Sequence, residues 1–194
     1  MPLFSFLLYV IVSSFTPGPN NLMAMLFANK YGLKNTIRFC LGVGAGFFIV
    51  ILLSSYFNLW LKNLIPKVQG VMTVLGVIYM VYLAVKIMMS KNHDADDENG
   101  RHNRFLMGML LQFINPKGIL YSISVASTFI IPYHTSNVSL ILYSLFLAAV
   151  GFMSTFCWSA FGSIFQTFIA KYRSPFNFVM GLLLIYSAVS ILVE

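Results

Sequence analysis

Two polar breaks interrupt apolar segments of the 194-residue chain, Phe15-Thr-Pro-Gly-Pro-Asn-Asn21 in the first half and Phe113-Ile-Asn-Pro-Lys-Gly118 in the second. Proline removes a backbone donor and disrupts the preceding helical turn, so each break releases backbone polar groups within an apolar run. Inside a membrane, such groups must be buried in protein or line a cavity. Paired breaks at corresponding places in two halves of a chain therefore predict a transporter's substrate site.

The first break holds five candidate substrate-binding residues, which are Pro17, Gly18, Pro19, Asn20 and Asn21. We expect the helix to kink or unwind here, because two prolines flank a glycine that tolerates non-helical conformations. The freed carbonyls would be available to a substrate ammonium group, and the resumed helix, starting near Asn20 and Asn21, would face a carboxylate. The alternative is a structural kink whose polar groups are satisfied by neighbouring helices.

The second break adds three candidates, Gln112, Asn115 and Lys117. At about 1.5 Å per residue from Phe105, Lys117 lies roughly 18 Å into its span. A lysine near a helix centre costs at least ~2.5 kcal/mol unless it is hydrated or paired, so such residues are usually functional. We favour Lys117 as the fixed counter-charge for a substrate carboxylate. It could instead reach carbonyls released at the opposite break.

The acidic residues and the histidines all lie outside the apolar segments, at Asp94, Asp96, Asp97, Glu98 and Glu194 and at His93, His102 and His134. A proton relay of the usual Asp, Glu or His type is therefore missing from the membrane interior. A Ser or Cys nucleophile would also have no nearby base. We expect no catalytic residue, no enzymatic activity, and no cofactor or metal, since the two cysteines lack metal-ligand spacing.

Composition identifies an integral membrane protein. The chain is 59% hydrophobic and only 9% charged, with a mean hydropathy of +0.84, whereas ordinary globular domains are about 25% charged. Its formal charge of +7 comes from basic residues scattered among connections rather than gathered on one face with aromatic residues. Membrane lipid is thus an expected partner, and nucleic acid is not.

Six apolar stretches are each long enough to cross about 30 Å of hydrocarbon. They are Leu3 to Ala28, Phe39 to Leu61, Gly70 to Met89, Phe105 to Ile131, Val138 to Gly162, and Phe176 to Val193. The sequence therefore predicts an all-α membrane protein with six transmembrane helices, of which the first and fourth are broken. Gly42, Gly44 and Gly46 form a small-residue face on the second span, which predicts a close helix contact.

The basic residues of the connections predict the orientation of the chain. Connections one, three and five carry Lys30, Lys34 and Arg38, then Lys86, Lys91, Arg101 and Arg104, and finally Lys171 and Arg173, whereas the opposite side has only Lys62 and Lys67. Because positively charged connections stay in the cytoplasm, both termini should be periplasmic.

The chain divides into two halves around one polar linker. We expect a single transporter domain over 1–194, made of repeat one (1–89), a linker (90–104) and repeat two (105–194). Tyr82-Leu-Ala-Val-Lys-Ile87 is echoed by Tyr186-Ser-Ala-Val-Ser-Ile191, and Gly46-Phe47 by Gly151-Phe152. Because each half has three spans, a duplicated half must lie upside down relative to its partner. This inverted repeat predicts alternating access.

The motifs that carry a family resemblance are TPGPNNLM (residues 16–23), LGVGAGF (41–47), YLAVKI (82–87), LQFINPKGILY (111–121) and FCW (156–158). They resemble the LysE/RhtB family of amino-acid exporters, in order and over nearly the whole chain. The resemblance implies efflux of amino acids or their derivatives across the bacterial inner membrane, driven by proton or membrane-potential gradients. Carried over by position, Pro17, Gly18, Pro19, Asn20 and Asn115 match the family's motif elements.

We therefore expect a secondary transporter that exports a small zwitterionic amino acid or derivative by alternating access. Members of the family handle lysine, threonine, homoserine, leucine or cysteine-like compounds. The lack of an intramembrane acid disfavours a dibasic substrate such as lysine and favours a small neutral zwitterion.

Two other functions stay open. A membrane thiol-disulfide electron carrier, a function of distantly similar six-span proteins, would use Cys40 and Cys157 in the equivalent second and fifth spans. Neither cysteine adjoins a proline break, and we expect both to be buried and inert. A non-transporting scaffold subunit would tolerate substitutions at Asn20 and Lys117. The sequence does not set the oligomeric state, and a homo-oligomer remains open.

Overall fold

The computed structural model describes residues 2–60, 65–89 and 104–193, and within these ranges the chain forms helices and no β-strand. In chain order the helices are α1 (Leu3–Phe15), α2 (Pro19–Tyr31), α3 (Leu33–Trp60), α4 (Ile65–Met89), α5 (Arg104–Ile114), α6 (Pro116–Val125), the π-helix η2 (Ala126–Ile130), α7 (Asn137–Ile164), α8 (Gln166–Lys171) and α9 (Arg173–Val193).

Four of these helices, α3, α4, α7 and α9, are long and apolar enough to cross a membrane, while α1 and α5 are shorter apolar helices. The expected first span is divided into α1 and α2, and the expected fourth into α5 and α6, which η2 continues. The 13 residues of α1 reach only about 20 Å, less than the roughly 30 Å of hydrocarbon. The helices are those of a membrane protein, and the arrangement of six spans as an inverted repeat stays a prediction.

Local sequence explains where the divided helices begin and end. Pro19 and Pro116 each occupy the first position of a helix, where the missing proline N–H would be unpaired in any case. Gly32 ends α2 with a φ of 79°, a conformation that glycine adopts without strain. The side chain of Ser136 accepts a hydrogen bond from the Ser139 N–H at 3.2 Å and caps the start of α7.

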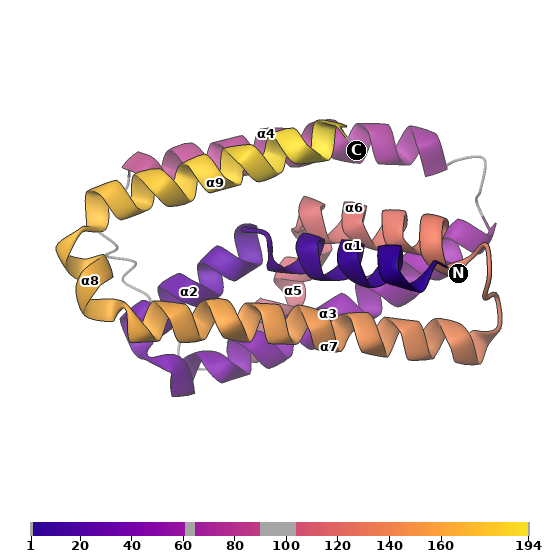
Figure 1. Ribbon diagram of the computed structural model, residues 1–194, viewed down its shortest axis with the longest axis horizontal. Coiled ribbons are helices and arrows are strands. Elements are labelled where there is room, and N and C mark those ends of the chain that lie inside the picture. The colour runs from indigo at the N-terminus through magenta and orange to yellow at the C-terminus, as the bar shows by residue number, and fades with distance from the viewer. Residues whose placement is uncertain (1, 61–64, 90–103, 194) are drawn as a thin grey trace.

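The helices form three layers (Figure 1). The α4 and α9 helices lie side by side along the top of the view, α1, α2 and α6 lie in the middle, and α3 and α7 run below them. Ala84 of α4 and Leu184 and Ala188 of α9 are fully buried in one cluster, together with Leu22 of α2. The middle layer therefore holds both broken helices between two pairs of long ones.

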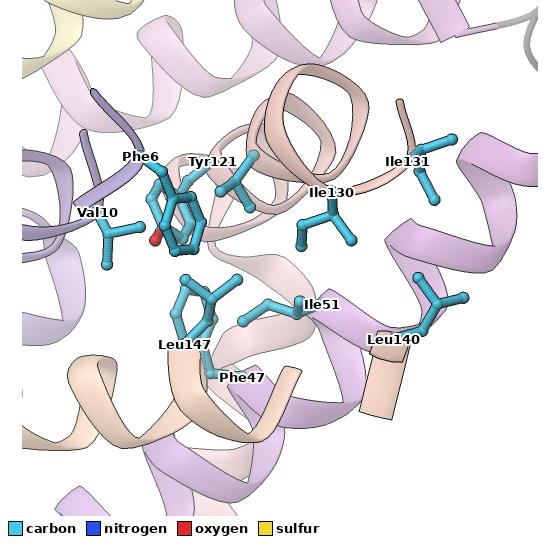
Figure 2. Packing of buried hydrophobic residues seen from close by; sticks show 10 residues of the cluster. Phe6, Val10, Phe47, Ile51, Tyr121, Ile130, Ile131, Leu140 and Leu147 are labelled. Atoms are coloured by element: carbon cyan, nitrogen blue, oxygen red, sulfur yellow. The ribbon is translucent and has the colours of Figure 1, made fainter. Parts of the chain in front are cut away.

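A second apolar cluster joins the middle layer to α3 and α7 (Figure 2). Phe6 and Val10 of α1 lie there with Phe47 of α3 and Tyr121 of α6. The Tyr121 ring stacks on that of Tyr9, with centroids 5.7 Å apart, and also on that of Phe47 at 5.7 Å. This aromatic stack fixes α6 against α1 and α3 beside the two breaks.

The glycines of α3 make close helix contacts, but on two faces rather than one. Side chains at Gly42 and Gly46 would collide with the backbone carbonyls of Phe105 and Met109 in α5, whereas a Cβ at Gly44 would lie 3.3 Å from the Cβ of Phe152 in α7. Residues four apart share a helix face, and residues two apart do not. The expected single face is therefore wrong for Gly44, and the expected close contact is confirmed for the other two.

Several expected features lie outside the described residues. The predicted linker, 90–104, is described only at its last residue, Arg104, where α5 begins. The Arg104 guanidinium donates a hydrogen bond to the Asn35 carbonyl at 3.0 Å. The division of the chain into repeat one, linker and repeat two therefore stays a prediction.

Candidate functional site

The first break is closed by hydrogen bonds from side chains of other helices. Between the end of α1 at Phe15 and the start of α2 at Pro19, the chain leaves the backbone carbonyls of residues 14–17 without partners inside their own helix. All of these carbonyls accept side-chain hydrogen bonds. The donors are Asn21 of α2, Lys117 of α6, Ser154 and Trp158 of α7, and Ser187 of α9.

Three of the released carbonyls are saturated. The backbone carbonyls of Ser14, Thr16 and Pro17 each accept two side-chain hydrogen bonds, at 2.7 to 3.2 Å. Because a carbonyl oxygen has two lone pairs, each of them is fully used. In this conformation they cannot also bind a substrate ammonium group, which is the role expected from the sequence. These carbonyls fit the alternative expectation, in which side chains of neighbouring helices provide the hydrogen bonds that the break leaves open.

Lys117 connects the two breaks. Its Nζ donates hydrogen bonds to the carbonyls of Thr16 at 2.8 Å and Pro17 at 3.2 Å. The C-terminal end of a helix carries partial negative charge, so the end of α1 stabilises the ammonium group. Of the two contacts considered for Lys117 from the sequence, the one with carbonyls of the opposite break is present in the structure.

Gly18 gives Lys117 the space that this contact needs. A Cβ at residue 18 would lie 2.9 Å from Cδ of Lys117 and 3.4 Å from its Nζ. The backbone of Gly18 is extended, with φ −155° and ψ 172°, a conformation open to any residue. The backbone at Gly18 is thus non-helical, as expected, but the close approach of the lysine, and not this conformation, explains why the residue is glycine.

A cavity of about 60 Å³ lies between the two breaks. It is lined by six of the eight candidate residues, which are Gly18, Asn20, Asn21, Gln112, Asn115 and Lys117. The other two do not line it: Pro17 contributes a carbonyl to Lys117 and Ser187, and Pro19 is buried at the start of α2. The structure thus brings together candidates that are about a hundred residues apart in sequence.

Amide side chains from both breaks meet at this cavity. Asn20 Nδ2 donates to Gln112 Oε1 at 2.8 Å, and Gln112 Nε2 donates to the Gly108 carbonyl at 3.2 Å. Asn115 is only 6% exposed, and its Oδ1 has no hydrogen-bond partner within the described ranges. A buried amide oxygen without a donor is costly. It is an acceptor suited to an N–H group of a ligand or to water.

Two helix N-termini also border the cavity. Gly18 precedes α2, and Lys117 and Gly118 lie in the first turn of α6; all three line the cavity. The first N–H groups of a helix lack intrahelical partners and carry partial positive charge. Together with the Lys117 ammonium group, these termini make the cavity electropositive and suit it to a carboxylate.

Sequence reasoning missed several polar residues of this region. Ser14, Tyr121 and Thr155 line the cavity, and Ser154, Trp158 and Ser187 hold the α1 carbonyls. Serine and threonine are common at helix contacts in membranes, so their presence in apolar spans is a weak signal. Ser187 lies in the echoed segment 186–191, which was the best available indication.

The cysteines do not form a redox pair. Both are free; Cys40 is buried, with Sγ 3.2 Å from Oγ of Ser159, whereas Cys157 is exposed. The expectation that both are buried is wrong for Cys157, which lies on the outward face of α7. This arrangement does not favour a thiol-disulfide electron carrier. The part of the chain that the structure describes also contains no group of His, Cys, Asp or Glu side chains able to hold a metal ion.

Comparison with known proteins identifies the family. A profile described as "LysE type translocator" matches residues 11–194. The chain is 35% identical to a cysteine/O-acetylserine efflux protein of Klebsiella pneumoniae, over 98% of this chain and 96% of the relative. It is 33% identical to one from Escherichia coli strain K12, over 96% and 95% of the two chains. No solved structure was found to match it.

These matches confirm the family resemblance drawn from the motifs. Within the family the same motifs are most similar to those of the cysteine/O-acetylserine exporter, and the names of the relatives confirm this likeness too. They agree with the long apolar helices, which are those of a multi-pass membrane protein. The chain belongs to the LysE type translocator family.

Proposed function

We propose that this protein is a secondary transporter that exports small neutral amino acids or derivatives, such as cysteine or O-acetylserine, across the bacterial inner membrane by alternating access. The observation that carries the proposal is the cavity between two broken helices, to whose lining amide side chains, helix N-termini and one lysine contribute. Membership of the family and the efflux function named for relatives of nearly equal length support it.

The charges around the cavity suggest how a zwitterion would bind. Its carboxylate would lie at the N-termini of α2 and α6, beside the Lys117 ammonium group. Its ammonium group would donate to Asn115 Oδ1, the buried acceptor that lacks a protein donor in the described structure. Lys117 can turn toward the carboxylate at modest cost, because the carbonyls of Thr16 and Pro17 each keep a second donor, Asn21 and Ser187.

The cavity favours a small substrate without a second charge. A water needs roughly 10–15 Å³ of such space, so about 60 Å³ holds several waters or the polar part of a small amino acid. Among the residues that the structure describes, no carboxylate lines it to pair with a cationic side chain. A lysine-like substrate would bury an unpaired ammonium group, which costs several kcal/mol or more.

For alternating access, we propose that repeats 1–89 and 105–194 are inverted relative to one another, with both termini periplasmic. The echoed segments support this. A Cβ at Gly151 would lie 2.7 Å from the Phe47 ring, so two of the echoed residues meet between α3 and α7. The other echoed glycine, Gly46, packs on α5, and Phe152 lies beside Gly44 instead. The matching alanines 84 and 188 are likewise buried in one cluster between α4 and α9.

Transport into inverted membrane vesicles tests the proposal. Vesicles that contain the protein should accumulate labelled O-acetylserine when a gradient is imposed. The variant Asn115→Ala should lower the rate about tenfold, because one lost hydrogen bond to a charged group is worth roughly 1.5–3 kcal/mol. Asn20→Ala should also lower it. Asn35→Ala is the matched control, since Asn35 is exposed on α3 and lines no described cavity.

Protein levels in the membrane distinguish binding from folding. Both cavity variants should accumulate nearly as well as the parent. Loss of both variants from the membrane would mean that the breaks are chiefly structural, and failure to accumulate any neutral amino acid in the parent vesicles would reject export itself.

A further inference from the structure

A second cavity, of about 110 Å³, lies on the other side of Lys117, between α1, α4, α6 and α9. Each of these helices contributes a hydroxyl or amide side chain to its wall: Ser13 from α1, Gln69 and Thr73 from α4, Ser124 from α6, and Ser190 from α9. Thr16, directly after the end of α1, adds another hydroxyl. None of these residues lines the first cavity except Ser13. Sequence analysis did not indicate this cavity.

The two cavities share part of their walls. Ser13, Lys117 and Tyr121 line both of them. Side chains can change rotamer far faster than helices rearrange. The Lys117 ammonium group can therefore contact a ligand from either side without movement of α6 itself.

The chemistry of the second cavity suits a neutral polar solute. Lys117 is the one charged residue that lines it, and no acidic residue does so in the described structure. Hydroxyl and amide groups in a membrane interior are costly unless they are paired or hydrated. Gln69 Nε2 reaches Ser124 Oγ at 3.4 Å and links α4 to α6 across the wall. A space of this polarity and size holds water or a small polar molecule rather than a lipid chain.

The wall formed by α4 and α9 is attached to both breaks. A Cβ at Gly76 of α4 would lie 2.7 Å from Cβ of Pro116, at the start of α6. Ser187 of α9 donates to the Pro17 carbonyl at 2.7 Å. A rearrangement of either broken helix would therefore move this wall and change access to the second cavity.

We propose that the second cavity is a second substrate compartment, in which the exported amino acid rests after it passes the Lys117 and Tyr121 side chains. The substrate carboxylate keeps one counter-charge throughout this step, because Lys117 lines both compartments. The hydroxyl side chains of the second compartment replace water around the rest of the zwitterion. This inference rests on the proposed export function and adds a route to it.

Cysteine accessibility tests the compartment directly. The background protein is the full-length chain with Cys157→Ser, and Cys40 can stay because it is buried. In this background, Thr73→Cys and Ser190→Cys each place a thiol in the cavity. Their matched controls are Val74→Cys and Val189→Cys, neighbouring positions that are 55% and 52% exposed on the apolar outer surface. The reagent is a charged methanethiosulfonate, which reacts with thiolates. Because thiolates form poorly in apolar surroundings, a thiol that faces lipid should react slowly and a thiol in a hydrated cavity should react fast.

In nanodiscs, the two cavity thiols should react much faster than the two controls. Their reaction should slow about tenfold when O-acetylserine is present at ten times its Kd, because free sites then fall by about that factor. Glutamate at the same concentration should not protect them. The mass of the intact protein reports the labelling.

Transport by the same proteins separates the two proposals. If the Cys157→Ser protein exports O-acetylserine but the cavity thiols react no faster than the controls, the compartment is dry and the inference is overturned. If they react equally fast with and without O-acetylserine in an exporting protein, the space is a water pocket off the substrate's route, which also overturns it. If the parent protein exports no neutral amino acid, the proposed function is rejected, and the proposed substrate compartment is rejected with it.

Discussion

At the scale of single residues, Lys117 is the side chain that unites the site. It begins one half of a broken helix and donates to carbonyls at the end of another, Thr16 and Pro17. A charge at this depth is tolerated because the end of α1 supplies partial negative charge in place of an acidic side chain. Gly18 leaves room for it. The lysine is thus both a structural contact and the cation nearest to the proposed carboxylate position.

Replacement of Lys117 by methionine separates these two roles. Each carbonyl would keep one other donor, Asn21 or Ser187, so Lys117→Met should reach the membrane at nearly parental levels. Export of O-acetylserine should fall about tenfold or more, because a charge-assisted hydrogen bond to the carboxylate is worth roughly 1.5–3 kcal/mol. Lys34→Met, at an exposed position on α3, is the control. Unchanged export by Lys117→Met would remove the lysine from the substrate site.

At the scale of helices, glycines set how closely α3 and α5 approach. A side chain at Gly108 would collide with the Phe39 carbonyl, just as one at Gly42 would collide with that of Phe105. Glycine at both positions lets backbone meet backbone, as is common where helices pack in membranes. This contact holds α5 in place and thereby positions Gln112 and Asn115 at its C-terminal end.

A matched pair of glycine variants tests this contact. Gly108→Ala should lower the apparent Tm in detergent by about 2 to 12 °C, because overpacking costs roughly 1–3 kcal/mol and about 2–4 °C accompany each kcal/mol. Gly70→Ala on α4 should leave it unchanged or raise it, since no atom lies within 4 Å of the added Cβ and alanine favours helix. Equal effects of the two substitutions would contradict the packing argument.

The sequence predicted helices and breaks well because their causes are local. Prolines 17, 19 and 116 determine where helices stop and restart, whatever surrounds them. The partners of the released carbonyls could not be predicted in this way. Trp158 and Ser187 lie more than a hundred residues from the first break. Their segments, the FCW motif and the echo at 186–191, stood out in the sequence, but nothing there indicated which carbonyls these side chains bind. The face of Gly44 was missed because three alternating glycines conceal the helical period.

At the scale of the whole molecule, apolar side chains face outward and polar ones face inward. On α4, for example, Val71, Val74 and Ile78 are more than half exposed, whereas Gln69 and Thr73 line a cavity. Such a surface is suited to lipid. The basic residues of connections one, three and five then orient the protein, and the proposed arrangement places both chain ends in the periplasm.

Fusions to the full-length chain test this orientation. Alkaline phosphatase folds only outside the cytoplasm, so a phosphatase joined after Glu194 should be active. A fluorescent protein that needs the cytoplasm to mature should be dark at the same position. Phosphatase inserted within residues 90–103 should be inactive, because the basic residues there keep that segment in the cytoplasm. The reverse pattern would place both termini inside the cell.

The saturated carbonyls of the first break also constrain how the chain is made. Their donors on α6, α7 and α9 are synthesised after α1 and α2, and Ser187 comes after the other donors along the chain. Until then, the carbonyls of residues 14–17 have only Asn21 as a side-chain partner, and lipid offers no other. We therefore expect residues 14–17 to stay hydrated until these later helices are made. The final packing of the first break then depends on the later helices, and not only on the entry of α1 and α2 into the bilayer.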